Sequence, residues 1–118
     1  MARVLFVEDE PAIQGLVREI LGSQGHDVTV ASDGAEALQL ISGGAEFHLL
    51  LTDICMPRGD GIDLMRALKA RGCRIPMVVV TGIVNPPRIM GISGIVQKPF
   101  RIAQLMGVIG PFLEKAAA

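Results

Sequence analysis

The segment LLLTDICMPRGDGIDL, residues 49–64, runs from a predicted strand through a loop into a predicted helix. Three leucines and a threonine predict a buried strand that ends at Asp53. After a proline and an Asp-Gly turn signal, the amphipathic stretch IDLMRALKA (62–70) predicts a helix. The position of Asp53 needs an explanation, because an unpaired charge at the end of a buried strand is energetically expensive.

Apolar runs alternate with amphipathic segments along the rest of the chain as well. Four more strands are predicted, namely RVLFV (3–7), DVTVA (27–31), MVVVT (77–81) and GIVQK (94–98), and the strand that ends at Asp53 covers 47–53. Further helices are predicted from Pro11 to Gly22 or Gly25, over 35–41 and over 101–115, the last weakened by Gly107, Gly110 and Pro111. This alternation predicts an α/β domain with a doubly wound, five-stranded parallel sheet and helices on both faces. We expect residues 1–118 to form a single domain.

Composition narrows the class of protein. Hydrophobic residues make up 50% of the chain, which argues against disorder. Eleven basic residues face twelve acidic ones, for a net charge of −1, so no direct nucleic-acid binding is expected. No apolar run reaches the length of a membrane span, and no signal peptide is apparent. We therefore expect a cytoplasmic protein that does not interact with the membrane.

Charged and polar residues lie at the carboxyl ends of four of the predicted strands. Glu8 and Asp9 follow the first strand, Asp53 ends the third, Thr81 ends the fourth and Lys98 ends the fifth. In doubly wound sheets, ligands bind outside the carboxyl ends of the strands, so we expect these side chains to converge there. Clustered carboxylates repel one another unless a cation lies among them, and hard oxygen ligands suit Mg²⁺. Mg²⁺ and Lys98 would explain why the charge of Asp53 is tolerated.

Over essentially the whole chain, the sequence resembles the receiver domains of response regulators in two-component signalling. The resemblance rests on five motifs in order: VEDEP (7–11), LLTDICMP (50–57), the Asp-Gly pair at 60–61, VVVTG (78–82) and KPF (98–100). It implies a flavodoxin-like sheet with strand order 2-1-3-4-5, as in chemotaxis regulators.

The resemblance also implies a role for each matched residue. Asp53 would accept a phosphoryl group from the phosphohistidine of a sensor histidine kinase or phosphotransfer protein, and would pass the signal to a downstream target or effector domain. Mg²⁺ would be held by Asp9, Asp53 and the backbone carbonyl of Cys55, with Glu8 acting through a bound water. Thr81 and Lys98 would contact phosphoryl oxygens, and a cis peptide before Pro99 would aim Lys98 into the site.

Two departures from the family pattern affect the expected output route. Only sixteen residues, 82–97, separate Thr81 from Lys98, and they contain two adjacent prolines and three glycines. We therefore expect the fourth helix to be shortened or irregular. The family commonly has an aromatic switch residue three positions before the lysine, but this chain has Ile95 there. We hypothesise that the signal leaves through segment 82–93 instead.

Two alternatives remain beside the phosphoryl-accepting switch, which would not be an enzyme beyond its own phosphorylation and dephosphorylation. The first is a receiver-like interaction module that works without phosphorylation. The second is an aspartyl-phosphate hydrolase, but such enzymes usually carry an acid two residues after the nucleophile, and Cys55 occupies that place.

Overall fold

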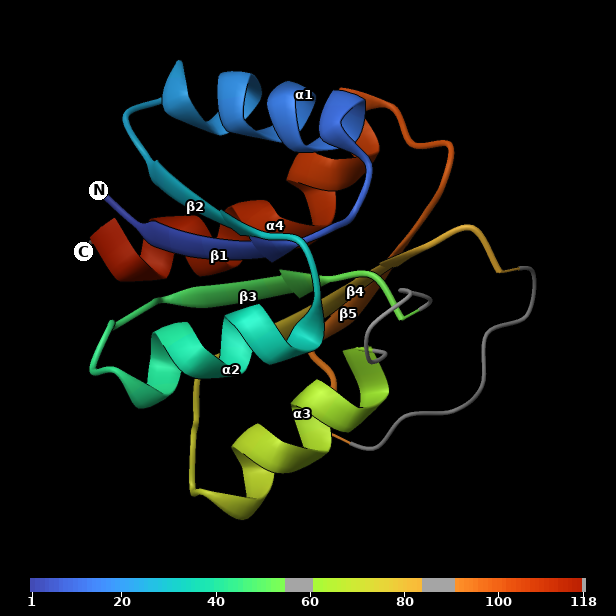
Figure 1. Cartoon of the computed structure of the whole chain (residues 1–118). Helices are drawn as coiled ribbons and strands as arrows, with labels where there is room; N and C mark the ends of the chain where they lie inside the picture. Colours follow the sequence, from blue (N-terminus) through green and yellow to red (C-terminus); the bar gives the residue numbers. More distant parts are fainter. Residues whose placement is uncertain (55–60, 84–90, 118) are drawn as a thin grey trace.

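A computed structural model describes residues 1–54, 61–83 and 91–117 of the chain (Figure 1). All five predicted strands are present: β1 (Arg3–Val7), β2 (Asp27–Ala31), β3 (Leu49–Thr52), β4 (Met77–Thr81) and β5 (Gly94–Gln97). They pair in parallel in the order β2-β1-β3-β4-β5. The predicted fold class and strand order are therefore confirmed.

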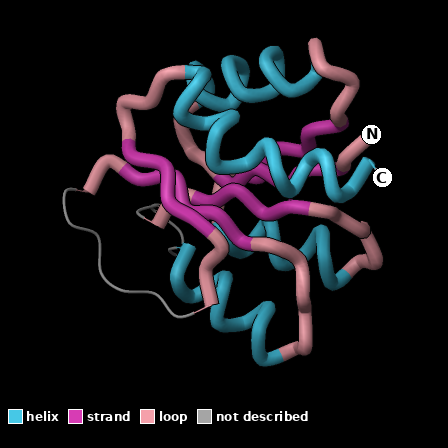
Figure 2. Tube along the Cα trace, turned by 180° about the vertical axis from the view of Figure 1, so that it is seen from behind, coloured by secondary structure: helices cyan, strands magenta, loops and turns pink. Residues whose placement is uncertain are grey.

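Four helices lie in the described residues and cover both faces of the sheet: α1 (Pro11–Gly22), α2 (Gly34–Ser42), α3 (Gly61–Ala70) and α4 (Ile102–Ala117). Helices α1 and α4 lie on one face, and α2 and α3 lie on the other (Figures 1 and 2). Side chains alternate across each strand, so Phe6 faces α1 and α4 while Leu5 and Val7 face α2 and α3. The two apolar cores thus fix the sheet between two helical layers.

Strand β3 is shorter than the predicted range 47–53. Its neighbour β1 ends at Val7, which pairs with Thr52, so strand pairing stops before Asp53. The Asp53 amide still donates to the Val7 carbonyl at 3.0 Å. Asp53 therefore lies one residue beyond the strand, at the carboxyl edge of the sheet.

Helix α4 is continuous although Pro111 lies inside it. The predicted weakening by glycine and proline does not end the helix, because the buried side chains of Leu105, Ile109 and Leu113 hold it against the sheet. The predicted irregular fourth helix falls mainly on residues 84–90, which lie outside the described residues. Among the helices that the structure describes, none combines the length and apolarity needed to cross a bilayer.

Gly61, the first residue of α3, lies against the backbone at the end of β3. A Cβ atom at this position would be 2.1 Å from the Asp53 carbonyl oxygen and 2.8 Å from the Thr52 hydroxyl oxygen. Both distances are far below van der Waals contact, so only glycine allows α3 to begin here.

We expect Gly61→Ala to destabilise the fold by about 1–3 kcal/mol or more, the usual cost of forcing an extra carbon into a packed site. Gly15→Ala is the matched control, because Gly15 lies in helix α1 with open space around it. That substitution should stabilise the protein by about 0.5–1 kcal/mol, since alanine favours a helix interior. Urea unfolding measures both, and equal stability of Gly61→Ala and wild type would contradict the close approach.

Candidate functional site

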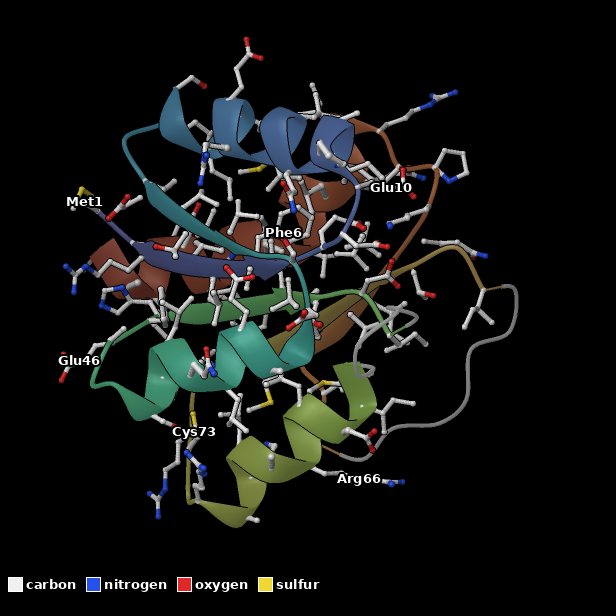
Figure 3. All side chains as sticks on the ribbon, in the orientation of Figure 1. Met1, Phe6, Glu10, Glu46, Arg66 and Cys73 are labelled. Atoms are coloured by element: carbon white, nitrogen blue, oxygen red, sulfur yellow. The ribbon has the colours of Figure 1, made fainter. Side chains whose placement is uncertain are left out.

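The carboxyl ends of β1, β3 and β5 bring charged side chains to one edge of the sheet. Glu8 and Asp9 follow β1, Asp53 follows β3, and Lys98 follows β5. In Figure 3, Glu10 marks this edge, whereas Met1 and Glu46 lie at the opposite one. The convergence expected from a doubly wound sheet is therefore found.

The Lys98 ammonium joins two buried carboxylates. Its Nζ lies 2.9 Å from Asp53 Oδ2 and also donates to Glu8 Oε1. The Glu8 side chain is fully buried, and Asp53 is only 7% exposed. Buried charges of this kind are tolerated when they are paired and hydrogen-bonded, which explains how Asp53 can lie at the end of a buried strand.

Backbone amides hold the second oxygen of Glu8. Its Oε2 accepts hydrogen bonds from the Asp9 amide at 3.1 Å and from the Glu10 amide at 3.4 Å. The Gln14 side chain donates to the Glu8 backbone carbonyl from the first turns of α1. Glu8 is therefore held from three elements, and its carboxylate has little rotational freedom.

The pKa values of the pair shift for different reasons. Burial raises the pKa of Glu8 above its ordinary value, and the hydrogen bond and charge of Lys98 oppose this only in part. Burial alone would lower the pKa of Lys98, but its hydrogen bonds to Glu8 and Asp53 and their negative charges outweigh burial and leave that pKa raised. Lys98 is therefore held as a cation, whereas an ionised Glu8 is costly for the folded protein.

Three carboxylates can reach a common point. One oxygen from each of Glu8, Asp9 and Asp53 lies within 4.8 Å of the other two. An all-oxygen donor set fits a hard divalent cation such as Mg²⁺ better than zinc, and Asp9 is exposed, so water ligands have access. The residues present therefore fit the metal that the sequence suggested.

Thr81 borders the same site. A pocket of about 340 Å³ is lined by Asp9, Asp53, Thr81 and Lys98, together with Glu10, Gly82 and Ile83. The Thr81 hydroxyl accepts a hydrogen bond from the Ile83 amide at 3.1 Å. The Gln97 side chain of β5 donates to the Ile83 carbonyl at 3.2 Å. The end of β4 is thus linked to β5 through Ile83.

Most of the residues singled out in the sequence come together here. Glu8, Asp9, Asp53, Thr81 and Lys98 share one site, and the peptide between Lys98 and Pro99 is cis, as expected. The predicted metal ligand at Cys55 lies outside the described residues, as do Met56, Pro57 and Asp60.

Three side chains that support the site were not predicted from the sequence. Gln14 contacts the backbone of Glu8, Gln97 contacts Ile83, and the Thr52 hydroxyl contacts Asp53. Nothing in their local sequence distinguishes the two glutamines from ordinary surface residues. The only signal at Thr52 is a polar residue at the end of an otherwise apolar strand.

Comparisons with known proteins agree with this geometry. The sequence model of the response regulator receiver domain matches residues 4–110. The response regulator MprA of Mycobacterium leprae is 31% identical over 96% of this chain and 51% of its own length, so the chain spans about half of that relative.

Two solved structures are similar over nearly their whole length. The Francisella response regulator 1452 receiver domain has a TM-score of 0.87 and 27% identity, covering 98% of each chain. The response regulator TrrA of Thermotoga maritima, solved in complex with Mg²⁺-BeF, has a TM-score of 0.85 and 25% identity, covering 95% of this chain and 99% of its own.

The raised pKa of Glu8 predicts how stability changes with pH. The folded protein binds this proton more tightly than the unfolded chain does. The resulting stabilisation is complete below about pH 4.5, the ordinary value for glutamate, and is lost as the pH rises through the raised pKa. In EDTA, Glu8→Gln should therefore gain stability relative to wild type between pH 4.5 and 7.

Urea unfolding at a series of pH values measures this difference. Glu19→Gln, on the exposed side of α1, controls for the loss of one carboxylate elsewhere. A wild type that gains stability over Glu8→Gln as the pH rises would contradict the direction of the shift.

Proposed function

The chain belongs to the family of response regulator receiver domains, and we propose that it is a phosphoryl-accepting switch whose acceptor is Asp53. The donor would be the phosphohistidine of a sensor histidine kinase or a phosphotransfer protein. The observation that carries this proposal is the Lys98 ammonium 2.9 Å from Asp53 Oδ2, inside a pocket that Thr81 also lines. Residues 1–118 would form a single receiver domain.

In the proposed reaction, an Asp53 carboxylate oxygen attacks the phosphorus atom in line with the bond to the donor imidazole nitrogen. A new P–O bond forms, the P–N bond breaks, and the imidazole leaves with the electron pair and takes up a proton. Asp53 then carries an acyl phosphate. Hydrolysis of that acyl phosphate by water returns the carboxylate and releases inorganic phosphate.

Lys98 lowers the barrier by placing a positive charge beside the phosphoryl oxygens. It is already oriented by Glu8 and Asp53, so little reorganisation is needed when the phosphoryl group arrives. Mg²⁺ bound by Asp9, Asp53 and the Cys55 carbonyl, with Glu8 acting through water, would supply further positive charge to those oxygens. The buried Glu8 fits an indirect role, because Lys98 and two backbone amides hold its oxygens.

Incubation with acetyl phosphate and Mg²⁺, followed by intact-mass measurement, tests the proposal. Wild type should gain one phosphoryl group, and Asp53→Asn should gain none, because the amide keeps the size of the side chain but is not a nucleophile. EDTA should abolish the gain. Labelling of Asp53→Asn, or of wild type without a metal, would contradict the assigned acceptor or the metal requirement.

A folded wild type that stays unlabelled by acetyl phosphate and by phosphorylated histidine kinases would favour the second candidate. This is a receiver-like module that binds partners without phosphorylation. The observation in its favour is Ile95 on β5, which is 40% exposed and stands where the family commonly has its aromatic switch.

The output would begin at Thr81. When its hydroxyl turns to donate to a phosphoryl oxygen, the hydrogen bond that it accepts from the Ile83 amide is lost. Ile83 is tied to β5 by Gln97, so the change would reach the β5 face that carries Ile95. This route needs no aromatic side chain and passes through Ile83, which lies within the 82–93 segment expected from the sequence.

Amide hydrogen exchange at Ile83 measures this step. With beryllium fluoride and Mg²⁺ as the phosphoryl mimic, exchange at Ile83 should rise about fivefold, as expected for the loss of a hydrogen bond with a net value of about 1 kcal/mol. Thr81→Val should show fast exchange with and without the mimic. Identical exchange in the two states of wild type would rule out this route.

A further inference from the structure

The Thr52 hydroxyl is a buried polar group in an apolar layer. Thr52 is fully buried at the end of β3, and its paired neighbours are Val7 on β1 and Val79 on β4. Valine has nearly the volume of threonine, and both paired neighbours are valines, so the size of the side chain does not by itself explain the hydroxyl. The hydroxyl therefore has to be explained by a hydrogen bond, because a buried polar group is energetically costly unless it is hydrogen-bonded.

That hydroxyl contacts the backbone of the acceptor residue. Thr52 Oγ1 donates to the Asp53 carbonyl oxygen at 2.8 Å. On the other side of the same residue, the Asp53 amide donates to the Val7 carbonyl at 3.0 Å. The main chain of Asp53 is thus held at both its amide and its carbonyl, although Asp53 lies beyond the last paired residue of β3.

Helix α3 confines the same carbonyl from outside the sheet. The Gly61 backbone is so close that a Cβ there would lie 2.1 Å from the Asp53 carbonyl oxygen and 2.8 Å from Thr52 Oγ1. The Asp53 carbonyl oxygen, the Thr52 hydroxyl and the first residue of α3 are therefore in mutual contact. Rotation of the peptide group that follows Asp53 would move the Asp53 carbonyl oxygen away from these contacts.

We infer that Thr52 is a positioning residue for phosphoryl transfer, whose hydroxyl holds the Asp53 carbonyl and so fixes the direction in which the acceptor carboxylate points. The inference rests on the proposed function and adds a residue to it. Once the main chain of Asp53 is held, only the two torsions of its side chain determine where the attacking carboxylate oxygen lies. A misplacement of about 1 Å can slow a reaction on the order of a hundredfold. If the Asp53 carbonyl is no longer held, the rate of phosphorylation at Asp53 should therefore fall measurably.

The test compares Thr52→Val, which removes only the hydroxyl, with Thr52→Ser, which keeps it. With saturating acetyl phosphate and Mg²⁺, we expect Thr52→Val to be labelled on the order of tenfold to a hundredfold more slowly than wild type. The acetyl phosphate concentration that gives half the maximal rate should stay unchanged, because Thr52 does not line the pocket. Thr52→Ser should recover a rate within about threefold of wild type, since it keeps the donor.

A control separates positioning from general destabilisation. Ile109→Val trims a buried side chain on the α4 side of the sheet, away from the site, and should lower the melting temperature without changing the labelling rate. If Thr52→Val does not fold, Thr52→Ala makes the same comparison, because alanine also lacks the hydroxyl and takes less space.

Amide exchange at the buried Ile54, whose N–H belongs to the same peptide group as the Asp53 carbonyl, tests the backbone contact without any phosphorylation. Faster exchange in Thr52→Val than in wild type and Thr52→Ser supports the contact. Equal exchange in all three overturns the inference. So does a wild-type labelling rate in Thr52→Val, and this result leaves the proposed function intact. A wild type that is never labelled overturns the proposed function and the positioning role together, whatever the exchange experiment gives.

Discussion

The contact on which the site depends is the ammonium of Lys98 between the carboxylates of Glu8 and Asp53. Lys98 follows β5 at one edge of the sheet, Asp53 follows β3, and Glu8 follows β1, so a single side chain reaches across the intervening β4. Without it, two carboxylates would be buried beside each other, and each would lose both hydration and its counter-charge. The strand order therefore brings these three charged side chains together, and the charge balance of the site depends on it.

The positive charge of Lys98 does not fully compensate the cost of burying the Glu8 carboxylate. The pKa of Glu8 remains raised by burial even with Lys98 beside it, while the pKa of Lys98 is raised by its two acidic partners. A second cation at the exposed side, near Asp9, would favour the ionised form of Glu8. The energetic cost of the buried carboxylates would thus favour the binding of a divalent metal.

Rigidity around Asp53 comes from neutral contacts as much as from charge. Its main chain is held by Val7, by the Thr52 hydroxyl and by the close approach of Gly61, and its side chain is held by Lys98. The Thr81 hydroxyl, in contrast, accepts a hydrogen bond of 3.1 Å from the Ile83 amide. The arrangement places the proposed acceptor, whose position is fixed, beside a hydroxyl that would change its hydrogen-bond partner in the proposed switch.

Apolar periodicity was sufficient to predict the five strands, the helices on both faces and which residues lie at the carboxyl ends of the strands. Burial of the sheet on both faces imposes apolar runs on the strands, and burial on one face imposes an amphipathic pattern on the helices. The motifs around Asp53 and Lys98 added the strand order and the expected roles. Local sequence could not predict that β3 stops before Asp53, that α4 continues through Pro111, or that Thr52, Gln14 and Gly61 support the acidic site. Those features depend on contacts between segments far apart in the chain, whose distances are set only when the helices pack on the sheet.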